Sequence, residues 1–406
     1  METPPELDYE LLDALVRRIF FIEDITIGHG ERDYMVRYHG RLLSADSAGA
    51  HAQLSEWLAP HGLTPLFRWD DGRQAVYLVR GMPKTVKPAN PAVNMLMFIL
   101  TLASVIFTGG ILGITGELPE QPVALVVEFL KAGWPFAVSM LAILAAHEFG
   151  HYFAARMHNI HVSLPYFIPM PWPVSPFGTL GAFINMKELP RNRRQLLDIA
   201  IAGPLAGLGV AIPVLFIGLS LSQINPLPAA PGADPLVGNM MEGNSILYLL
   251  LKYLRFGQML PAPATYGDLS PVVYWLRYFF TAQPLPYGGV DVNVHPVAWA
   301  GWAGLLVTAM NLIPAGQLDG GHLLYVLFGQ KVSRRILPLI LVFLAALGFF
   351  WNGWWLWAVL IFFLVGRSYA EPLDQITTLD RKRKWLAGLG LLVFILVFTP
   401  VPLYIM

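Results

Sequence analysis

The chain has 406 residues, of which 55% are hydrophobic and only 13% are charged. This composition is typical of a membrane protein and excludes an ordinary soluble domain. Lys+Arg and Asp+Glu are equal at 27 each, so the charge balance gives no indication of a nucleic-acid partner. The absence of cysteine excludes disulfides and thiolate ligands, which leaves His, Asp and Glu as the candidate metal ligands.

Residues 1–88 carry a large share of the charges and predict a small soluble α+β domain on the cytoplasmic side. Helical patterns near residues 7–19 and in SAGAHAQLSEWLAP alternate with strand-like segments such as IEDITIG and AVYLVRG. The acidic start, METPPELDYE, has no features of a signal or transit peptide. The segment MPKTVKPANP then predicts a linker into the membrane.

The remainder of the chain predicts a polytopic α-helical membrane protein with about seven transmembrane helices. We expect these spans at residues 93–114, 134–157, 196–221, 296–312, 335–350, 354–365 and 385–404. The implied division is a domain at 1–88, three spans within 89–222, an extracytoplasmic insertion at 223–294, and the C-terminal spans within 295–406. The insertion is rich in Pro and Gly and has helical patterns at 245–256 and 271–280.

Basic residues flank the predicted spans in four groups, and the positive-inside rule uses them to set the orientation. The groups lie at residues 80–87, 187–194, 331–335 and 367–384. With seven spans and a cytoplasmic N-terminus, all four groups fall on the cytoplasmic side. The second span then ends near the cytoplasmic face, so an active site at its end is predicted to open toward the cytoplasm.

Two histidines and a glutamate lie near the end of the second predicted span, in SMLAILAAHEFGHYFAAR. His147 and His151 are four residues apart, so on a helix they share a face and can present two imidazoles to one ion. Glu148 can hold a water on that metal and take its proton. A buried histidine pair without a metal is the alternative, but ionisable side chains at membrane depth are costly and usually functional. The pattern predicts a zinc hydrolase.

A catalytic zinc usually has three protein ligands, so the two histidines leave one ligand to be found. The next glutamate after the motif is Glu188, beyond a Pro-rich loop, and Ala154 and Met157 stand where a metzincin has glycine and histidine. The segment NLIPAGQLDGGH predicts a broken apolar helix with Asp319 at the break. Asp319 is a candidate ligand, although an N-cap role fits its position equally well, and His322 competes with it.

Three motifs in this order resemble the site-2 protease family, whose members are intramembrane zinc metalloproteases. They are HEFGH, AGPLAG and NLIPAGQLDGG, which match the family's HExxH motif and its Asn-x-x-Pro-x-x-x-Leu-Asp-Gly pattern over about residues 134–330. The resemblance implies a zinc ion held by His147, His151 and Asp319, with Glu148 as the general base. It also implies that Asn311 positions the substrate or donates to the oxyanion.

The stretch PVSPFGTLGAFINMKELPRNRRQLLDIAIAGPLAG is most similar to the branch that includes the chloroplast EGY proteins and their bacterial relatives. The insertion at 223–294 is too short for the full PDZ domain of the best-known bacterial members. Because the N-terminus lacks transit-peptide features, we expect a prokaryotic plasma membrane rather than an organelle.

An extended substrate can pair with an exposed strand edge, and FGTLGAFINM at 177–186 is the best candidate for that edge. The resemblance places a membrane-associated β element here, although the segment could be an ordinary loop packed against the third span. The predicted substrate-binding residues are Gly178, Thr179, Leu180, Gly181, Ala182 and Phe183.

The expected function is zinc-dependent hydrolysis of peptide bonds within or near transmembrane segments of membrane proteins, as in regulated intramembrane proteolysis. The expected partners are a transmembrane protein substrate and membrane lipid, with no nucleic acid. Two alternatives stay open: an ion- or proton-coupled transporter that uses His, Glu and Asp as a relay, and a catalytically silent zinc-binding scaffold.

Overall fold

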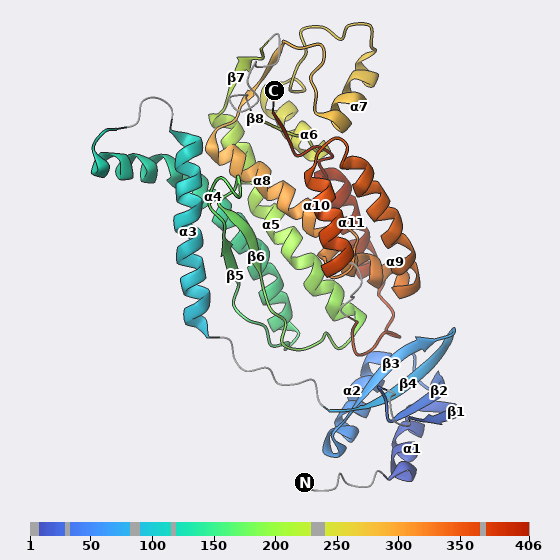
Figure 1. Cartoon of the computed structure of the whole chain (residues 1–406). Helices are drawn as coiled ribbons and strands as arrows, with labels where there is room; N and C mark the ends of the chain where they lie inside the picture. The colour runs from blue at the N-terminus through green and yellow to red at the C-terminus, as the bar shows by residue number, and fades with distance from the viewer. Residues whose placement is uncertain are drawn as a thin grey trace.

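The computed structural model describes residues 8–28, 33–81, 90–114, 119–228, 240–365 and 371–405. A small α+β unit, residues 8–81, lies at one end of a helical bundle, and an irregular cap covers the other end (Figure 1). Most of the predicted linker, residues 82–89, lies outside the described residues.

The N-terminal unit (residues 8–81) is a four-stranded antiparallel sheet in the order β1-β2-β4-β3, with two helices. Its elements are α1 Tyr9–Arg17, β1 Phe20–Ile27, β2 Val36–Leu42, α2 Ser47–Leu58, β3 Leu63–Asp70 and β4 Arg73–Arg80. Asp71 and Gly72 have positive φ and join β3 to β4, as expected for a two-residue hairpin turn. The core of the unit is apolar and includes Leu54, Phe67 and Val76, which are inaccessible to solvent.

Three helices are long and apolar enough to cross a membrane: α3 Pro91–Gly113, α4 Pro122–Met157 and α5 Arg193–Leu221. The N-terminal part of α4 is continuous with the second span and projects away from the bundle (Figure 1). Close approach of α3 and α4 needs Gly133, because a Cβ there would lie 2.1 Å from the carbonyl oxygen of Ile106.

The C-terminal part of the bundle is built from shorter or interrupted helices, α8 Pro296–Asn311, α9 Asp319–Leu347, α10 Gly353–Leu360 and α11 Arg381–Val397. The helical dihedrals of α9 break at Gly329, which has a φ of 79°. A π-helical turn, η2 Ile361–Val365, follows α10. Among the described residues only α3, α4 and α5 meet the length and hydropathy of a span, so the seven predicted spans stay a prediction.

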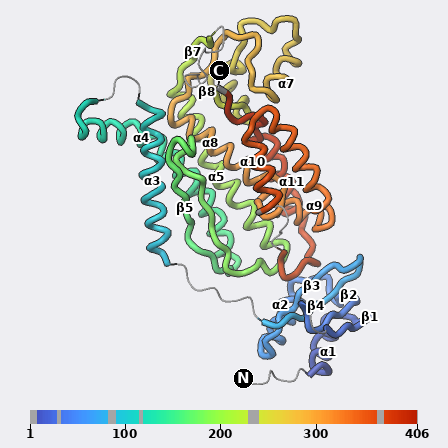
Figure 2. Tube along the Cα trace, viewed as in Figure 1, coloured from blue at the N-terminus to red at the C-terminus, as the bar shows by residue number. Residues whose placement is uncertain are grey.

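The middle of the bundle is the contact between α4, α5 and α8, which run side by side in both ribbon and tube views (Figure 2). A β-hairpin of β5 Tyr166–Pro169 and β6 Thr179–Phe183 packs beside them against α3. It is fixed there by Ser104, whose Oγ donates to the carbonyl oxygen of Gly178 at 2.6 Å. The hairpin therefore has a defined position beside the helix that carries the histidines.

The cap covers the end of the bundle away from the N-terminal unit (Figure 1). It comprises β7 Gln223–Pro226, β8 Met240–Glu242, α6 Ile246–Phe256, α7 Pro271–Thr281, β9 Val290–Asn293 and the C-terminal β10 Leu403–Ile405. β7 pairs with β9 and β8 pairs with β10, so the cap also holds the end of the chain.

The N-terminal unit is joined to the bundle by the segment before α11. Phe67 in β3 donates its N–H to the carbonyl of Leu373 and accepts from Gln375, at 2.9 and 3.0 Å. The Asp374 carboxylate between them is fully buried and accepts from the Ser47 Oγ of α2 at 2.7 Å. On its other side this segment bonds the stretch before α5, so three distant parts of the chain meet at one junction.

Candidate active site

The HEFGH motif lies on α4, and its three ionisable side chains are buried among the helices of the bundle. His147, Glu148 and His151 are only 3%, 5% and 8% exposed. His151 Nδ1 lies 2.8 Å from the carbonyl oxygen of Ile199 on α5. Because a carbonyl can only accept, Nδ1 carries a proton, and in the neutral ring Nε2 then has the lone pair. This is the tautomer that a metal-binding histidine needs, and its orientation is fixed by α5.

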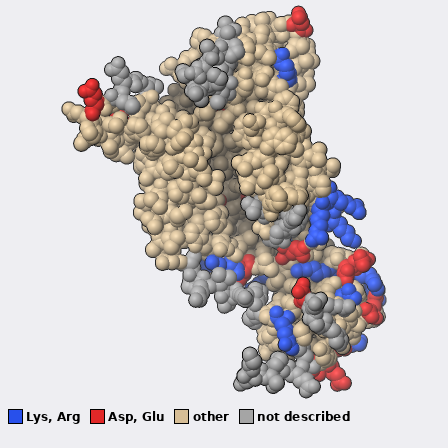
Figure 3. All heavy atoms as spheres, viewed as in Figure 1, with Lys and Arg blue, Asp and Glu red and all other residues tan. Residues whose placement is uncertain are grey.

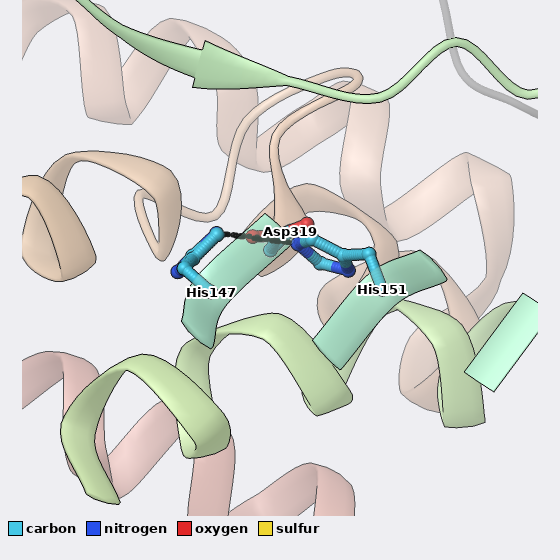
Figure 4. Close-up of side chains that lie close together, drawn as sticks. All are labelled: His147, His151 and Asp319. Atoms are coloured by element: carbon cyan, nitrogen blue, oxygen red, sulfur yellow. Dashed lines mark hydrogen bonds and ion pairs between the residues drawn. The ribbon is translucent and has the colours of Figure 1, made fainter. Parts of the chain in front are cut away.

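Asp319 is the first residue of α9 and follows a tight turn after α8. The turn requires glycine at 320, since a Cβ there would lie 1.9 Å from the carbonyl oxygen of Leu312. The N-cap of α9 is Leu318, and no side chain caps the helix. The Asp319 carboxylate instead turns toward the two histidines on α4 (Figure 4).

The two imidazoles and the carboxylate bring three ligand atoms close together (Figure 4). Asp319 Oδ2 lies 3.5 Å from His147 Nε2 and 3.3 Å from His151 Nε2, and the two nitrogens are 3.2 Å apart. A tetrahedral zinc ion with ligands at about 2.0–2.1 Å sets its ligand atoms roughly 3.4 Å apart. The three separations match that value, so the residues present fit a zinc ion.

The three ligand atoms lie at a cavity of about 210 Å³ between α4, α5, α9 and the hairpin. Glu148 lines the same cavity beside the two histidines. Asn311, the last residue of α8, also lines it and places its Nδ2 3.2 Å from His147 Nε2. The cavity thus combines a metal-ligand set, a carboxylate that is not part of it, and an amide donor.

His322, the competing third ligand, lines the cavity one turn after Asp319. It is buried, and its Nδ1 has no hydrogen-bond partner among the described residues. The group of closely spaced ligand atoms found in the described part of the chain consists of His147, His151 and Asp319, without His322. The geometry therefore favours the carboxylate over this imidazole.

The glycines of the AGPLAG motif make room for the two histidines. A Cβ at Gly203 would lie 2.1 Å from His151 Nε2, and one at Gly207 would lie 3.2 Å from the His147 Cβ. The sequence pattern did not predict that these glycines lie against the histidines. The available signal was spacing, since the two glycines, like the two histidines, are four residues apart and can share one helix face.

The predicted substrate-binding residues lie in and just before β6. Gly178 precedes the strand with a φ of +73°, and residues 179–183 form the strand itself. Ala182 and Phe183 line the cavity, whereas Leu180 does not and is 65% exposed. Among the described strands β6 pairs with β5 alone, so its other edge faces no strand.

Comparison with known proteins gives one family and a set of plant relatives. Residues 135–350 match a family model described as "Peptidase family M50". The chain is 32% identical over 277 residues to the probable zinc metalloprotease EGY2, chloroplastic, of Oryza sativa subsp. indica, which covers 68% of this chain and 44% of that protein. It is 29% identical over 326 residues to the probable zinc metalloprotease EGY1, chloroplastic, of Arabidopsis thaliana, with 76% and 53% covered. No solved structure matches the chain.

These relatives correct one expectation from the sequence. The prediction of a prokaryotic plasma membrane is wrong, because the relatives are named chloroplastic. It rested on the missing transit-peptide features in the first residues. The chain spans only about 44% of the length of the first relatives, so its first residues carry no information about a targeting segment.

The match to the family model includes all three motifs whose residues meet at the cavity, HEFGH, AGPLAG and NLIPAGQLDGG. Because this match extends over more than half of the chain, the chain belongs to peptidase family M50, the site-2 protease family of zinc metalloproteases.

Proposed function

We propose that the chain is a zinc metalloendopeptidase that hydrolyses peptide bonds within or near the transmembrane segments of membrane proteins. The observation that carries this proposal is the spacing of His147 Nε2, His151 Nε2 and Asp319 Oδ2, which fits one zinc ion in a cavity between membrane-length helices. The relatives named probable zinc metalloproteases support the same chemistry. Their names point to a plastid membrane as its location.

In this proposal His147, His151 and Asp319 hold the zinc ion. Zinc in such a site polarises a carbonyl and lowers the pKa of water toward neutrality. Glu148, beside the ligands, takes the proton of the attacking water and passes it to the nitrogen of the leaving amine. The Asn311 amide donates to the carbonyl oxygen as it gains negative charge.

The substrate has to be extended before its carbonyls can be attacked, because a helix uses them in its own hydrogen bonds. We propose that the extended segment pairs with the free edge of β6 and so adds a strand to the hairpin. The proposed contacts are Gly178, Thr179, Leu180, Gly181, Ala182 and Phe183, of which the last two line the cavity.

The proposal keeps the division of the chain into residues 1–88, 89–222, 223–294 and 295–406, with about seven spans. The proposed biological process is regulated intramembrane proteolysis, with a transmembrane protein as the substrate and membrane lipid around the enzyme. The transporter and the silent scaffold are not favoured, since the relatives are named probable zinc metalloproteases and Glu148 lines the cavity.

The test is cleavage of a single-span protein by the purified chain and its Glu148→Gln variant in detergent, with zinc counted by mass spectrometry. Glu128→Gln is the matched control, because Glu128 lies on the same helix but does not line the cavity. We expect about one zinc per chain in all three proteins and a loss of cleavage only in Glu148→Gln, on the order of 10²–10⁴-fold. Parent activity in Glu148→Gln, or zinc-free parent protein that still cuts, would contradict the proposal.

A further inference from the structure

The two helices of the cap each expose an apolar face. The large apolar side chains that α6 exposes are Ile246, Leu250, Tyr253 and Leu254, which recur at the spacing of one helix face. Those of α7 are Val272, Val273, Leu276 and Phe280, with the same spacing. Neither face is covered by another described part of the chain.

The inner side of α6 is partly polar. Lys252 of α6 is fully buried, and its Nζ lies 3.7 Å from both Glu242 Oε1 and Asp291 Oδ1. Tyr248 is also buried and donates to Glu242 at 2.8 Å. A helix on the surface of a soluble domain has the opposite arrangement, with its apolar stripe inward and its charges in water. The polar side of α6 therefore faces the protein and its apolar side faces outward, as expected for a helix in contact with lipid.

The two apolar faces are joined by a groove. It has a volume of about 690 Å³, and its walls are apolar and aromatic side chains from both helices, including Ile246, Leu249, Val272, Trp275, Leu276 and Phe279. A contiguous apolar surface of this kind marks a site of contact with another apolar phase rather than with water.

The surface next to the cap indicates what that phase is. α6 packs against α5 and α11, and the outer side chains of these helices, such as Ile217, Leu221 and Ile395, are also exposed and apolar. Figure 3 shows the uncharged surface of the bundle continuing into the cap, with only a few charged groups at its far end. The exposed face of α6 is thus an extension of the face that the membrane-length helices turn to lipid.

We propose that α6 and α7 are embedded in the membrane leaflet away from the N-terminal unit, with lipid acyl chains against their exposed faces and in the groove between them. Tyr253 and Trp275 are residue types that settle at the boundary between headgroups and acyl chains. The exposed Arg255 at the end of α6 and Asp268 in the connecting loop reach the headgroup region. Residues 246–281 are then a membrane-embedded hairpin within a segment expected to be wholly extracytoplasmic.

The absence of cysteine allows this to be tested with single spin labels. Leu250→Cys and Leu276→Cys are labelled in the full chain, reconstituted in phosphatidylcholine vesicles, and relaxation by oxygen is compared with relaxation by a water-soluble nickel chelate. Ile217→Cys on α5 is the lipid reference, and Asp33→Cys at an exposed position of the N-terminal unit is the water reference. We expect labels at 250 and 276 to relax more with oxygen than with nickel, as at 217, and the reverse at 33.

Stronger relaxation by nickel at 250 and 276 would place these faces in water and overturn the proposal. Protection from both reagents would also overturn it, because the faces would then be covered by protein, such as a second copy of the chain. The readout needs no proteolysis, so its outcome is independent of the proposed catalytic activity.

Discussion

The N-terminal unit and the helical bundle place their apolar and ionisable side chains in opposite locations. In the N-terminal unit, apolar side chains such as Leu54 and Phe67 are inside and the charges lie on the surface (Figure 3). In the bundle, apolar side chains such as Ile217 are outside, while ionisable groups such as His147 and Glu148 are buried. The difference follows from the solvent that each part faces, since only lipid favours an apolar exterior.

The two parts of the molecule also differ in their buried polar clusters, one of which lies at the junction with the N-terminal unit and the other inside the bundle. At the junction, the Asp374 carboxylate accepts from Ser47, from Thr377 and from two backbone N–H groups, so its neighbours satisfy it. In the bundle, Nε2 of His147, Nε2 of His151 and Oδ2 of Asp319 face one another, an arrangement that could hold a metal ion. The first cluster is thus complete without a ligand, whereas the second is a candidate metal site.

The largest effect is expected from Asp319→Ala, which removes one of the three ligand atoms. Metal affinity should fall by more than about 100-fold, because loss of even an outer partner of a metal ligand costs about 10–100-fold. Zinc content after dialysis against a weak chelator, together with cleavage, measures the change. Asp268→Ala in the exposed cap loop is the control. An Asp319→Ala protein that retains the parent's zinc would exclude this carboxylate as a ligand.

The second effect is steric and is expected from Gly203→Ala. The added Cβ would lie 2.1 Å from His151 Nε2, so the imidazole has to leave its position. Zinc affinity and cleavage should both fall by about 10–100-fold, as they do when the orientation of a ligand is lost. Gly209→Ala on the same helix is a close control, because a Cβ at Gly209 meets no atom within 4 Å. Equal zinc affinities in the two variants would show that Gly203 is not needed for the site.

Asp374→Ala tests the buried polar cluster at the junction between the N-terminal unit and the bundle. It leaves the hydroxyls of Ser47 and Thr377 buried without their acceptor, which should cost about 1–3 kcal/mol. The N-terminal unit should unfold at a lower temperature and be cut earlier by an added protease, while zinc content stays that of the parent. Asp33→Ala, at an exposed position, is the control. Loss of zinc in Asp374→Ala would mean that the two clusters are not separate.

The smallest effect is a pH dependence within the N-terminal unit. Tyr77 and His39 form hydrogen bonds to the Asp70 carboxylate at 2.7 and 2.9 Å, and they hold its pKa below the ordinary value of 3.8. A carboxyl whose pKa is lowered by folding stabilises the folded state above its ordinary pKa, and this stabilisation is lost as the pH falls from that value through the lowered pKa. Asp70→Asn should therefore flatten the loss of thermal stability as the pH falls below 3.8. Identical acid profiles for parent and variant would contradict this role.

Local pattern was sufficient to nominate residues that the structure brings together. The four-residue spacing of His147 and His151 put them on one helix face, and the broken helix at 311–322 made Asp319 a candidate ligand in competition with His322. The structure describes α4 as a helix through both histidines and places Asp319 at the start of α9. These features are predictable because helix period and backbone breaks are properties of short segments.

Contacts between distant segments could not be predicted in the same way. The Ser47–Asp374 bond joins residues 327 positions apart, and no periodicity relates them. The fit of Gly203 against His151 needs the packing of α5 on α4, and the inverted polarity of α6 needs the buried partners of Lys252.

The most direct test of the central claim is X-ray absorption at the zinc edge on the purified parent protein. The account predicts one zinc per chain with nitrogen and oxygen ligands at about 2.0–2.1 Å, two of them imidazoles, and an unchanged spectrum in His322→Gln. A spectrum with three imidazoles that loses one in His322→Gln would replace Asp319 by His322 as a ligand. Protein that binds no zinc would contradict the account of the site.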